Sequence, residues 1–347
     1  MKKLFSILLI FALLIPGATA LAEEAPLHLG YIAPMDADGD HYAHCAGAFA
    51  YAAERKGVSL TSLFFDPGDG DIPDGAESVE RMDPALAALT TLIEDGVDGV
   101  AVCAASVEQA LAAIDLAQEA GLPIVIEGPD VSSHDLPLPG AEESRPCVAV
   151  GYGDAPAYAA AMWLDEFAYN PLLLHCTLPQ ADPAIKAGIR RALGDARYLS
   201  LADNDVGATA NTARAGRAAV KMFADTSALF GCVLADSESL AEGCAQAIRK
   251  LGESFPVAAI ASSDAALELL RSGKIDMLAA APASVEGVQT FKALCDLVTE
   301  GILPESETAY VQLNPIVATK DDTSAWIGDD DYETAYALTY PEDHIVE

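Results

Sequence analysis

Residues 96–128 read GVDGVAVCAASVEQALAAIDLAQEAGLPIVIEG, and this stretch decides the fold class. Two short apolar runs, Gly99–Ala105 and Pro123–Gly128, flank a segment with the periodicity of an amphipathic helix. Ser106 opens a capping box at the start of that helix, and Gly121 ends it. Strand, helix and strand in this order predict a parallel βαβ unit. Strands this uniformly apolar are expected to be covered by helices on both faces.

The same alternation continues in both directions from this unit. In the first half we expect further strands at Leu27–Pro34, Ser59–Asp66 and Cys147–Tyr152, and helices at Asp40–Lys56, Pro84–Asp95 and Asp154–Tyr169. The second half repeats the pattern, with strands at Pro171–Leu178, Tyr198–Asp203, Ala228–Asp236, Val257–Ser263 and Met277–Ala283, and helices between and after them. Ser239 with Glu242 forms the capping box of one of these helices. We expect a last strand at Ala309–Lys320 and an acidic tail that wraps over the surface. The predicted fold class is therefore α/β, with two doubly wound parallel-sheet lobes.

The N-terminus has the features of an export signal. Lys2 and Lys3 precede the apolar segment Leu4–Ile15, and small residues at 18, 20 and 22 offer two cleavage sites. The apolar segment is short for a membrane span, although an uncleaved anchor stays an alternative. We therefore expect residues 1–22 to be a signal peptide and the mature chain to be periplasmic or secreted, and soluble.

Composition narrows the classes of partner. The 347 residues are 52% hydrophobic, which suits a folded chain of two domains. Without residues 1–22, 17 basic residues face 53 acidic ones, a net charge of 17 − 53 = −36. Such a surface repels nucleic acid and anionic lipids. An acidic shell that maintains solubility is the simpler interpretation, and a calcium- or polycation-linked role is the alternative. Seven cysteines leave at least one unpaired, and a local Cys232–Cys244 pair stays open.

Motifs for catalysis and cofactor binding are incomplete. Gly151-Tyr152-Gly153 follows a strand, but Pro156 replaces the third glycine of a dinucleotide fingerprint. Cys176 precedes a helix as in cysteine phosphatases, but the arginine they need six residues later is Asp182. A nucleophile–base pair for an exported hydrolase is not recognisable. We expect neither enzymatic activity nor a cofactor.

Two stretches have partial metal-binding patterns. Asp36, Asp38 and Asp40 begin like a calcium loop, but His41 occupies the position that requires glycine. His41, His44 and Cys45 have helical spacing for a transition metal, and they also fit a first helical turn with polar residues facing solvent or ligand. We expect no metal.

The order of elements resembles the sugar-type solute-binding proteins of the type I periplasmic fold, of which ribose-binding protein is the familiar example. The resemblance rests on the segments Leu29–Ile32, Gly96–Val100, Ala120–Val125, Gly273-Lys274 and Val317–Asp321. It implies an N-terminal lobe of residues 23–153 with 282–309 and a C-terminal lobe of residues 154–281 with 310–347. It also implies crossings near Gly151–Asp154, Ala280–Pro282 and Tyr310–Leu313, and lobes that close on a ligand. In such a family the chain is a monomer that delivers a small molecule to the permease of an ABC importer.

Positions just after strands are where parallel sheets hold ligands. The expected cleft residues are, in the first lobe, Asp40, His41, Tyr42, Ser106 and Glu127; at the hinge, Tyr152 and Asp154; and in the second lobe, Asp182, Asp236, Ser262 and Ser263. Two arginines and an aromatic platform of the family pattern are not matched. Clustered carboxylates without arginine favour a cation or a many-donor ligand such as an amine or a polyol, and we expect a ligand that is sugar-like, a polyol or an amine. The alternatives are a ligand-sensing adapter for a membrane receptor kinase and a degenerate copy with weak binding, and several of the expected residues could be ordinary helix N-caps.

Overall fold

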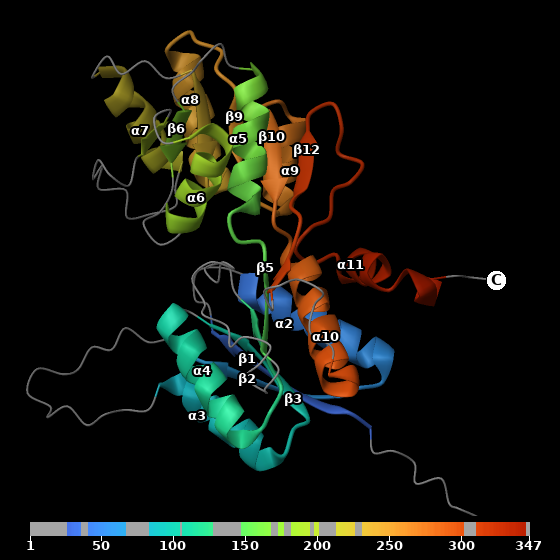
Figure 1. Cartoon of the computed structure of the whole chain (residues 1–347). Helices are drawn as coiled ribbons and strands as arrows, with labels where there is room; N and C mark the ends of the chain where they lie inside the picture. The colour runs from blue at the N-terminus through green and yellow to red at the C-terminus, as the bar shows by residue number, and fades with distance from the viewer. Residues whose placement is uncertain are drawn as a thin grey trace, which may run out of the picture.

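Two six-stranded sheets, each covered by helices, form two lobes that stand one above the other in the computed structural model (Figure 1). The structure describes residues 26–35, 41–66, 83–104, 106–127, 147–167, 173–176, 182–194, 198–200, 213–225, 231–301 and 310–344. In this part of the chain no helix is long and apolar enough to cross a membrane.

The first sheet has the strand order β11-β5-β4-β3-β1-β2, and every neighbouring pair is parallel. Its strands are β1 (His28–Pro34), β2 (Ser59–Phe65), β3 (Gly99–Cys103), β4 (Ile124–Glu127), β5 (Cys147–Gly151) and β11 (Tyr310–Gln312). Side chains alternate between two cores. Tyr31 and Val125 pack under α2 (His41–Lys56) and α10 (Ala283–Glu300), whereas Ile32 and Ile124 pack under α3 (Pro84–Asp95) and α4 (Val107–Ala120). The expectation of strands covered on both faces is confirmed.

The second sheet repeats this order as β12-β10-β9-β8-β6-β7. Its strands are β6 (Leu173–Cys176), β7 (Tyr198–Ser200), β8 (Cys232–Ala235), β9 (Val257–Ala259), β10 (Met277–Ala280) and β12 (Ile316–Thr319). Its helices are α5 (Ala155–Phe167), α6 (Asp182–Leu193), α7 (Ala213–Asp225), α8 (Glu238–Lys250) and α9 (Asp264–Arg271). Only β12 differs from its counterpart, because it runs antiparallel to β10. The parallel βαβ pattern predicted from residues 96–128 is therefore present in both lobes.

Helix ends follow the local chemistry of the sequence. Ser106 accepts a hydrogen bond from the backbone N–H of Gln109 and begins α4, and Gly121 ends it at a φ of 72°. Asp83 caps α3 in the same way. The cap of α8 is Ser237, not Ser239 as the capping-box pattern predicted. The Ser237 hydroxyl accepts a hydrogen bond from the backbone N–H of Leu240 at 3.3 Å, so the helix begins at Glu238, one residue before Ser239.

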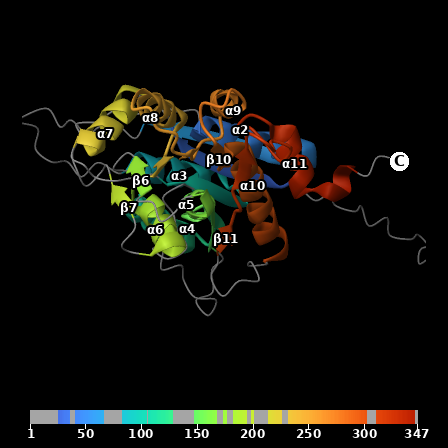
Figure 2. The same cartoon turned by 90° about the horizontal axis from the view of Figure 1, so that it is seen from above.

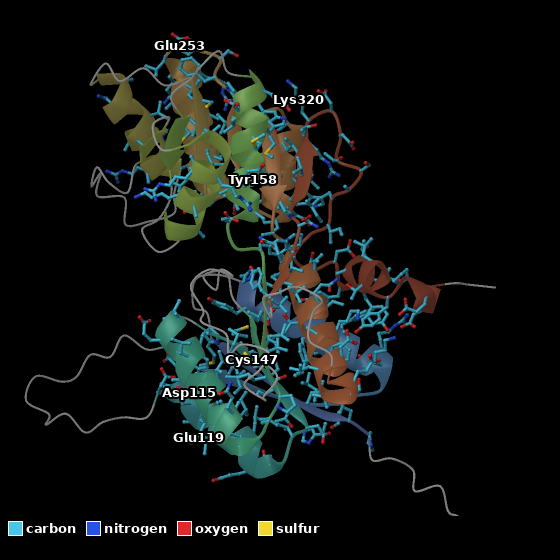
Figure 3. The ribbon with its side chains drawn as sticks, viewed as in Figure 1. Asp115, Glu119, Cys147, Tyr158, Glu253 and Lys320 are labelled. Atoms are coloured by element: carbon cyan, nitrogen blue, oxygen red, sulfur yellow. The ribbon has the colours of Figure 1, made fainter. Side chains whose placement is uncertain are left out.

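Glycines allow close approach of two helix pairs. A Cβ on Gly287 of α10 would overlap the carbonyl oxygen of Cys45 on α2. A Cβ on Gly243 of α8 would likewise overlap the carbonyl oxygen of Ala213 on α7. These pairs pack with their backbones almost in contact. Figure 3 shows the packed interior at Cys147 and the solvent-facing acidic side chains of α4, Asp115 and Glu119.

The chain passes between the lobes more often than expected. Crossings follow β5, β10 and β11, as the resemblance implied, but residues 320–331 then lead back to α11 (Tyr332–Thr339) beside α10 and α2 (Figure 2). The predicted strand Ala309–Lys320 is in fact two strands, β11 and β12, in different sheets. The tail is not a surface wrap, because Tyr336 of α11 is buried in the first-lobe core.

These findings change the expected lobe boundaries. Residues 310–312 pair with β5, and α11 packs on first-lobe helices, so both belong with the first lobe and not with residues 154–281. The physical reason is the aromatic character of the C-terminal segment. Tyr336 packs edge-on against Tyr51 of α2 with ring centroids 5.9 Å apart, and Lys56 of α2 forms an ion pair of 2.7 Å with Asp343.

Candidate functional site

A cavity of about 140 Å³ lies between the lobes. The first lobe contributes α2 and α10, and the second contributes α5, α6 and the loops after β8 and β9. The lining residues are His41, Tyr152, Gly153, Pro156, Ala157, Ala184, Ile185, Asp236, Ile260, Ala281 and Glu286. A cavity of this size holds about one six-membered ring. Its position, after the carboxyl ends of strands of both sheets, is where open α/β sheets bind ligands.

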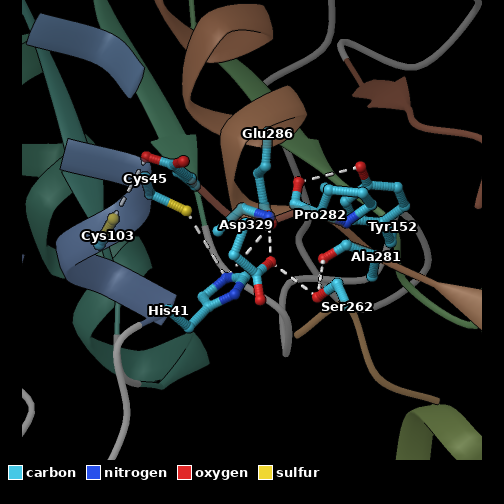
Figure 4. A network of polar contacts seen from close by, with 12 residues as sticks. His41, Cys45, Cys103, Tyr152, Ser262, Ala281, Pro282, Glu286 and Asp329 are labelled. Atoms are coloured by element: carbon cyan, nitrogen blue, oxygen red, sulfur yellow. Dashed lines mark hydrogen bonds and ion pairs between the residues drawn. The ribbon is translucent and has the colours of Figure 1, made fainter. Parts of the chain in front are cut away.

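The polar groups of the cavity come from opposite walls. His41 is the first residue of α2 and Glu286 lies in the first turn of α10, and their side chains form an ion pair of 3.3 Å between Nε2 and Oε2 (Figure 4). Asp236 follows β8 on the second-lobe side. Lysine and arginine are absent from the described lining. The cavity therefore offers acceptors from both lobes to a single guest, between apolar surfaces.

Behind this wall lies a buried polar network. Glu127 ends β4 and is 1% exposed; its Oε2 accepts hydrogen bonds from the Tyr31 hydroxyl at 2.8 Å and the Cys103 thiol at 3.2 Å. Burial, and then the charge of Glu286, raise the pKa of Glu127 to about 7. Burial also raises the pKa of the Cys45 thiol, and the two glutamates add to the effect. The raised pKa values keep the Cys45 thiol uncharged near neutral pH and leave Glu127 partly protonated, so the negative charge beneath the cavity comes from the carboxylates of Glu127 and Glu286.

His41 responds to this charge. Burial alone would lower the pKa of His41, but the hydrogen bond and charge of Glu286 outweigh burial and raise it. The imidazole is 31% exposed, so it is the part of the network that a molecule in the cavity can reach.

Hydrogen bonds at the crossing segments connect the two lobes. The Tyr152 hydroxyl donates to the carbonyl oxygen of Pro282 at 3.1 Å. Asp329, in the segment before α11, accepts from the Ser262 hydroxyl at 2.7 Å and from the backbone N–H of Ala283 at 2.9 Å (Figure 4). One carboxylate oxygen therefore contacts the second lobe and the N-terminus of α10 together.

The structure brings some of the expected cleft residues to the cavity and places others elsewhere. His41, Tyr152 and Asp236 line it. Asp40 lies outside the described residues, and Asp182 begins α6 with its side chain outside the described part. The remaining residues have structural contacts. Ser106 and Ser263 cap helices, Tyr42 packs on the first-lobe core, Asp154 pairs with Arg191 at 3.1 Å, and Glu127 and Ser262 have the partners given above.

Sequence reasoning missed Glu286 and the apolar lining. Glu286 follows β10 and the crossing at Ala281-Pro282, so its position after a strand was the available signal. Ile185, Ile260 and Pro156 carry no polar signal, and only the arrangement of the lobes shows that they meet at the cavity.

Comparison with solved structures identifies the architecture. A glucose-galactose binding protein, GanP, from Geobacillus stearothermophilus superimposes with a TM-score of 0.62 at 14% identity, over 87% of this chain and all of that one. An ABC transporter solute-binding protein from Bacillus halodurans with bound myo-inositol gives 0.62 at 14% identity, over 90% and all of that chain. A protein from Mycobacterium smegmatis in complex with β-D-fucofuranose gives 0.63 at 16% identity, over 90% and 98%.

This chain has the fold of the sugar-type periplasmic solute-binding proteins. The resemblance seen in the sequence is therefore confirmed at the level of the fold. No protein-family model matches the sequence, and no curated protein matches it. The periplasmic-binding fold explains the repeated sheet order and the position of the cavity between the lobes.

Proposed function

We propose that this protein is an exported solute-binding protein that captures a small sugar-like molecule, polyol or amine between its lobes and delivers it to an ABC importer. The observation that carries the proposal is the cavity, which takes its lining from both lobes and from the segments that cross between them. Solved proteins of the same fold include one bound to myo-inositol and one bound to β-D-fucofuranose. The signal-like residues 1–22 support export.

The charge of the lining narrows the ligand class. The carboxylates of Glu286 in the first lobe and Asp236 in the second can both accept hydrogen bonds, so a guest with several O–H or N–H donors can contact both walls. Such a guest favours the closed arrangement, because it contacts both lobes only when they approach. Anionic solutes are disfavoured, because the lining holds two carboxylates and its cationic group is His41. Binding, not catalysis, is the role that this lining supports.

Native mass spectrometry of freshly purified mature chain tests for a co-purified molecule in the expected size range. Titration calorimetry with monosaccharides, inositols and small polyamines then measures affinity. Asp236→Asn should weaken binding of the ligand identified, because a negatively charged acceptor is lost. The matched control is Glu253→Gln, an exposed carboxylate at the far end of the second lobe (Figure 3). If wild type and Asp236→Asn bind the ligand with equal affinity, the cavity is not the binding site.

A further inference from the structure

His41, Cys45 and Glu286 place three metal-ligand atoms around one point in the first-lobe wall. The imidazole nitrogen, the thiol sulfur and a carboxylate oxygen all lie within 4.8 Å of one another. His41 and Cys45 are one turn apart on α2, so they share a face of that helix, and Glu286 comes from α10. Gly287 allows this meeting, because any side chain there would push α10 away from the backbone at Cys45.

Two of the three distances between the ligand atoms match a four-coordinate site, and the third, from the Cys45 sulfur to the Glu286 carboxylate, is within 4.8 Å and would shorten on metal binding. Metal bonds of about 2.3 Å to sulfur and about 2.0 Å to nitrogen or oxygen place tetrahedral S and N ligands about 3.6 Å apart, and N and O ligands about 3.3 Å apart. In the structure, Cys45 Sγ is 3.6 Å from His41 Nε2, and His41 Nε2 is 3.3 Å from Glu286 Oε2. The same imidazole nitrogen makes both contacts, as it would if all three groups faced a common ion.

The buried carboxyl groups near this site have few cationic partners among the described residues. Glu286 is 1% exposed, and its Oε1 has no hydrogen-bond partner among the described residues. Glu127 is equally buried, and its Oε1 is likewise without a partner there. In the described part of the chain neither glutamate is paired with lysine or arginine, and His41 supplies the one cationic contact, to Glu286. A divalent cation bound to Glu286 would compensate more of this buried negative charge than His41 does alone, since buried charges are expected to be paired or to coordinate metals.

We propose that His41 Nε2, Cys45 Sγ and a Glu286 carboxylate oxygen bind a thiophilic divalent transition-metal ion of the Zn²⁺ class. Three protein ligands leave a fourth position, and because His41 and Glu286 line the cavity, that position faces the cleft. Binding displaces the thiol proton to solvent, so affinity rises with pH. The site shares His41 and Glu286 with the proposed solute cavity, but all three of its ligands come from the first lobe.

Cobalt tests the site directly. The full mature chain, reduced and treated with a chelator, is titrated with Co²⁺, and competition with Zn²⁺ gives the zinc affinity. The expected result is one equivalent of Co²⁺ with a thiolate-to-cobalt charge-transfer band and the intense visible bands of a four-coordinate ion. Cys45→Ser should abolish the charge-transfer band. His41→Gln and Glu286→Gln should each weaken Zn²⁺ binding by at least about 100-fold, since even outer-shell changes cost 10–100-fold.

Two controls match these variants. His44→Gln removes the neighbouring histidine, which contacts the Tyr332 hydroxyl instead, and Cys103→Ser removes another buried thiol. Both should keep the band. A wild-type protein without the band, or a band that survives Cys45→Ser, overturns the proposal.

Further measurements guard against misfolding and separate the two proposals. If circular dichroism shows that Cys45→Ser does not fold, His41→Gln serves as the test, because His41 is the first residue of its helix. An unchanged zinc affinity of His41→Gln would then overturn the proposed site. Solute titrations with and without chelator separate the proposals, because loss of the metal site leaves the contact of Asp236 with a solute intact.

Discussion

Replacing Glu127 by glutamine should remove most of the pH dependence of stability that this carboxyl group causes. In the folded chain its pKa is about 7, against an ordinary value of 4.5, because it is buried and near Glu286. The folded state therefore holds a proton that the unfolded state releases. Its stabilising contribution is complete below about pH 4.5 and is lost as pH rises through 7. At about 1.36 kcal/mol per pH unit between the two values, the loss comes to about 3 kcal/mol.

Urea unfolding at several pH values between 4 and 8, followed by far-ultraviolet circular dichroism in the presence of a chelator, measures this difference. Tryptophan fluorescence reports on the other lobe, because Trp163 and Trp326 pack against second-lobe cores. Burial lowers the pKa of His41 and Glu286 raises it overall, so His41 also contributes to the pH dependence, and the quantity of interest is the gap between the two stability curves. Glu119→Gln, on the exposed face of α4, is the control. A gap that stays constant across the range would refute the reasoning.

Three further changes test the packing and capping. Gly243→Ala should destabilise the second lobe by about 1–3 kcal/mol in urea unfolding, because the new methyl group meets the carbonyl oxygen of Ala213; a stabilised variant, as at an open helical glycine, would contradict this. Asp83→Ala should lower stability by about 1 kcal/mol through loss of the α3 cap, and an unchanged midpoint would count against that cap. Asp329→Ala should lower the free energy of unfolding by about 2 kcal/mol in thermal unfolding, while Asp330→Ala, at an exposed position, should change it little. Equal effects would show that the contacts of Asp329 with Ser262 and Ala283 do not stabilise the fold.

The repeating fold could be predicted because its signals are local. Residues 96–128 contain both strands, the capping serine and the terminating glycine of one unit, and the structure has all four. The division of the last predicted strand was also visible locally, since Asn314-Pro315 is a turn signal inside the apolar run. The return of α11 to the first lobe could not be predicted locally, because it depends on contacts with α2, such as that between Tyr332 and His44, which are 288 positions apart in the sequence.

The candidate site was only partly predictable for a related reason. A position just after a strand is equally typical of a residue that reaches a cleft and of a residue that caps the next helix. Ser106 and Ser263 are caps. His41 was recognisable as polar at the right place, but its partner Glu286 lies on a distant helix. No periodicity connects the two positions, and the pairing depends on the close approach of α2 and α10 at Gly287.

The position of the C-terminal segment determines the order in which the lobes can be completed. β11 supplies the edge of the first sheet, with Tyr310 bonded to Gly151 across 159 positions, and Tyr332 reaches His44 across 288. During synthesis, most of the second lobe can assemble before residues 310–339 are made. The first lobe is made earlier, but it cannot be completed until β11 and α11 have been synthesised. Contacts this distant in sequence slow folding. A chain shortened after Thr319 would keep every strand of both sheets yet leave the first-lobe helices without the aromatic cover of α11.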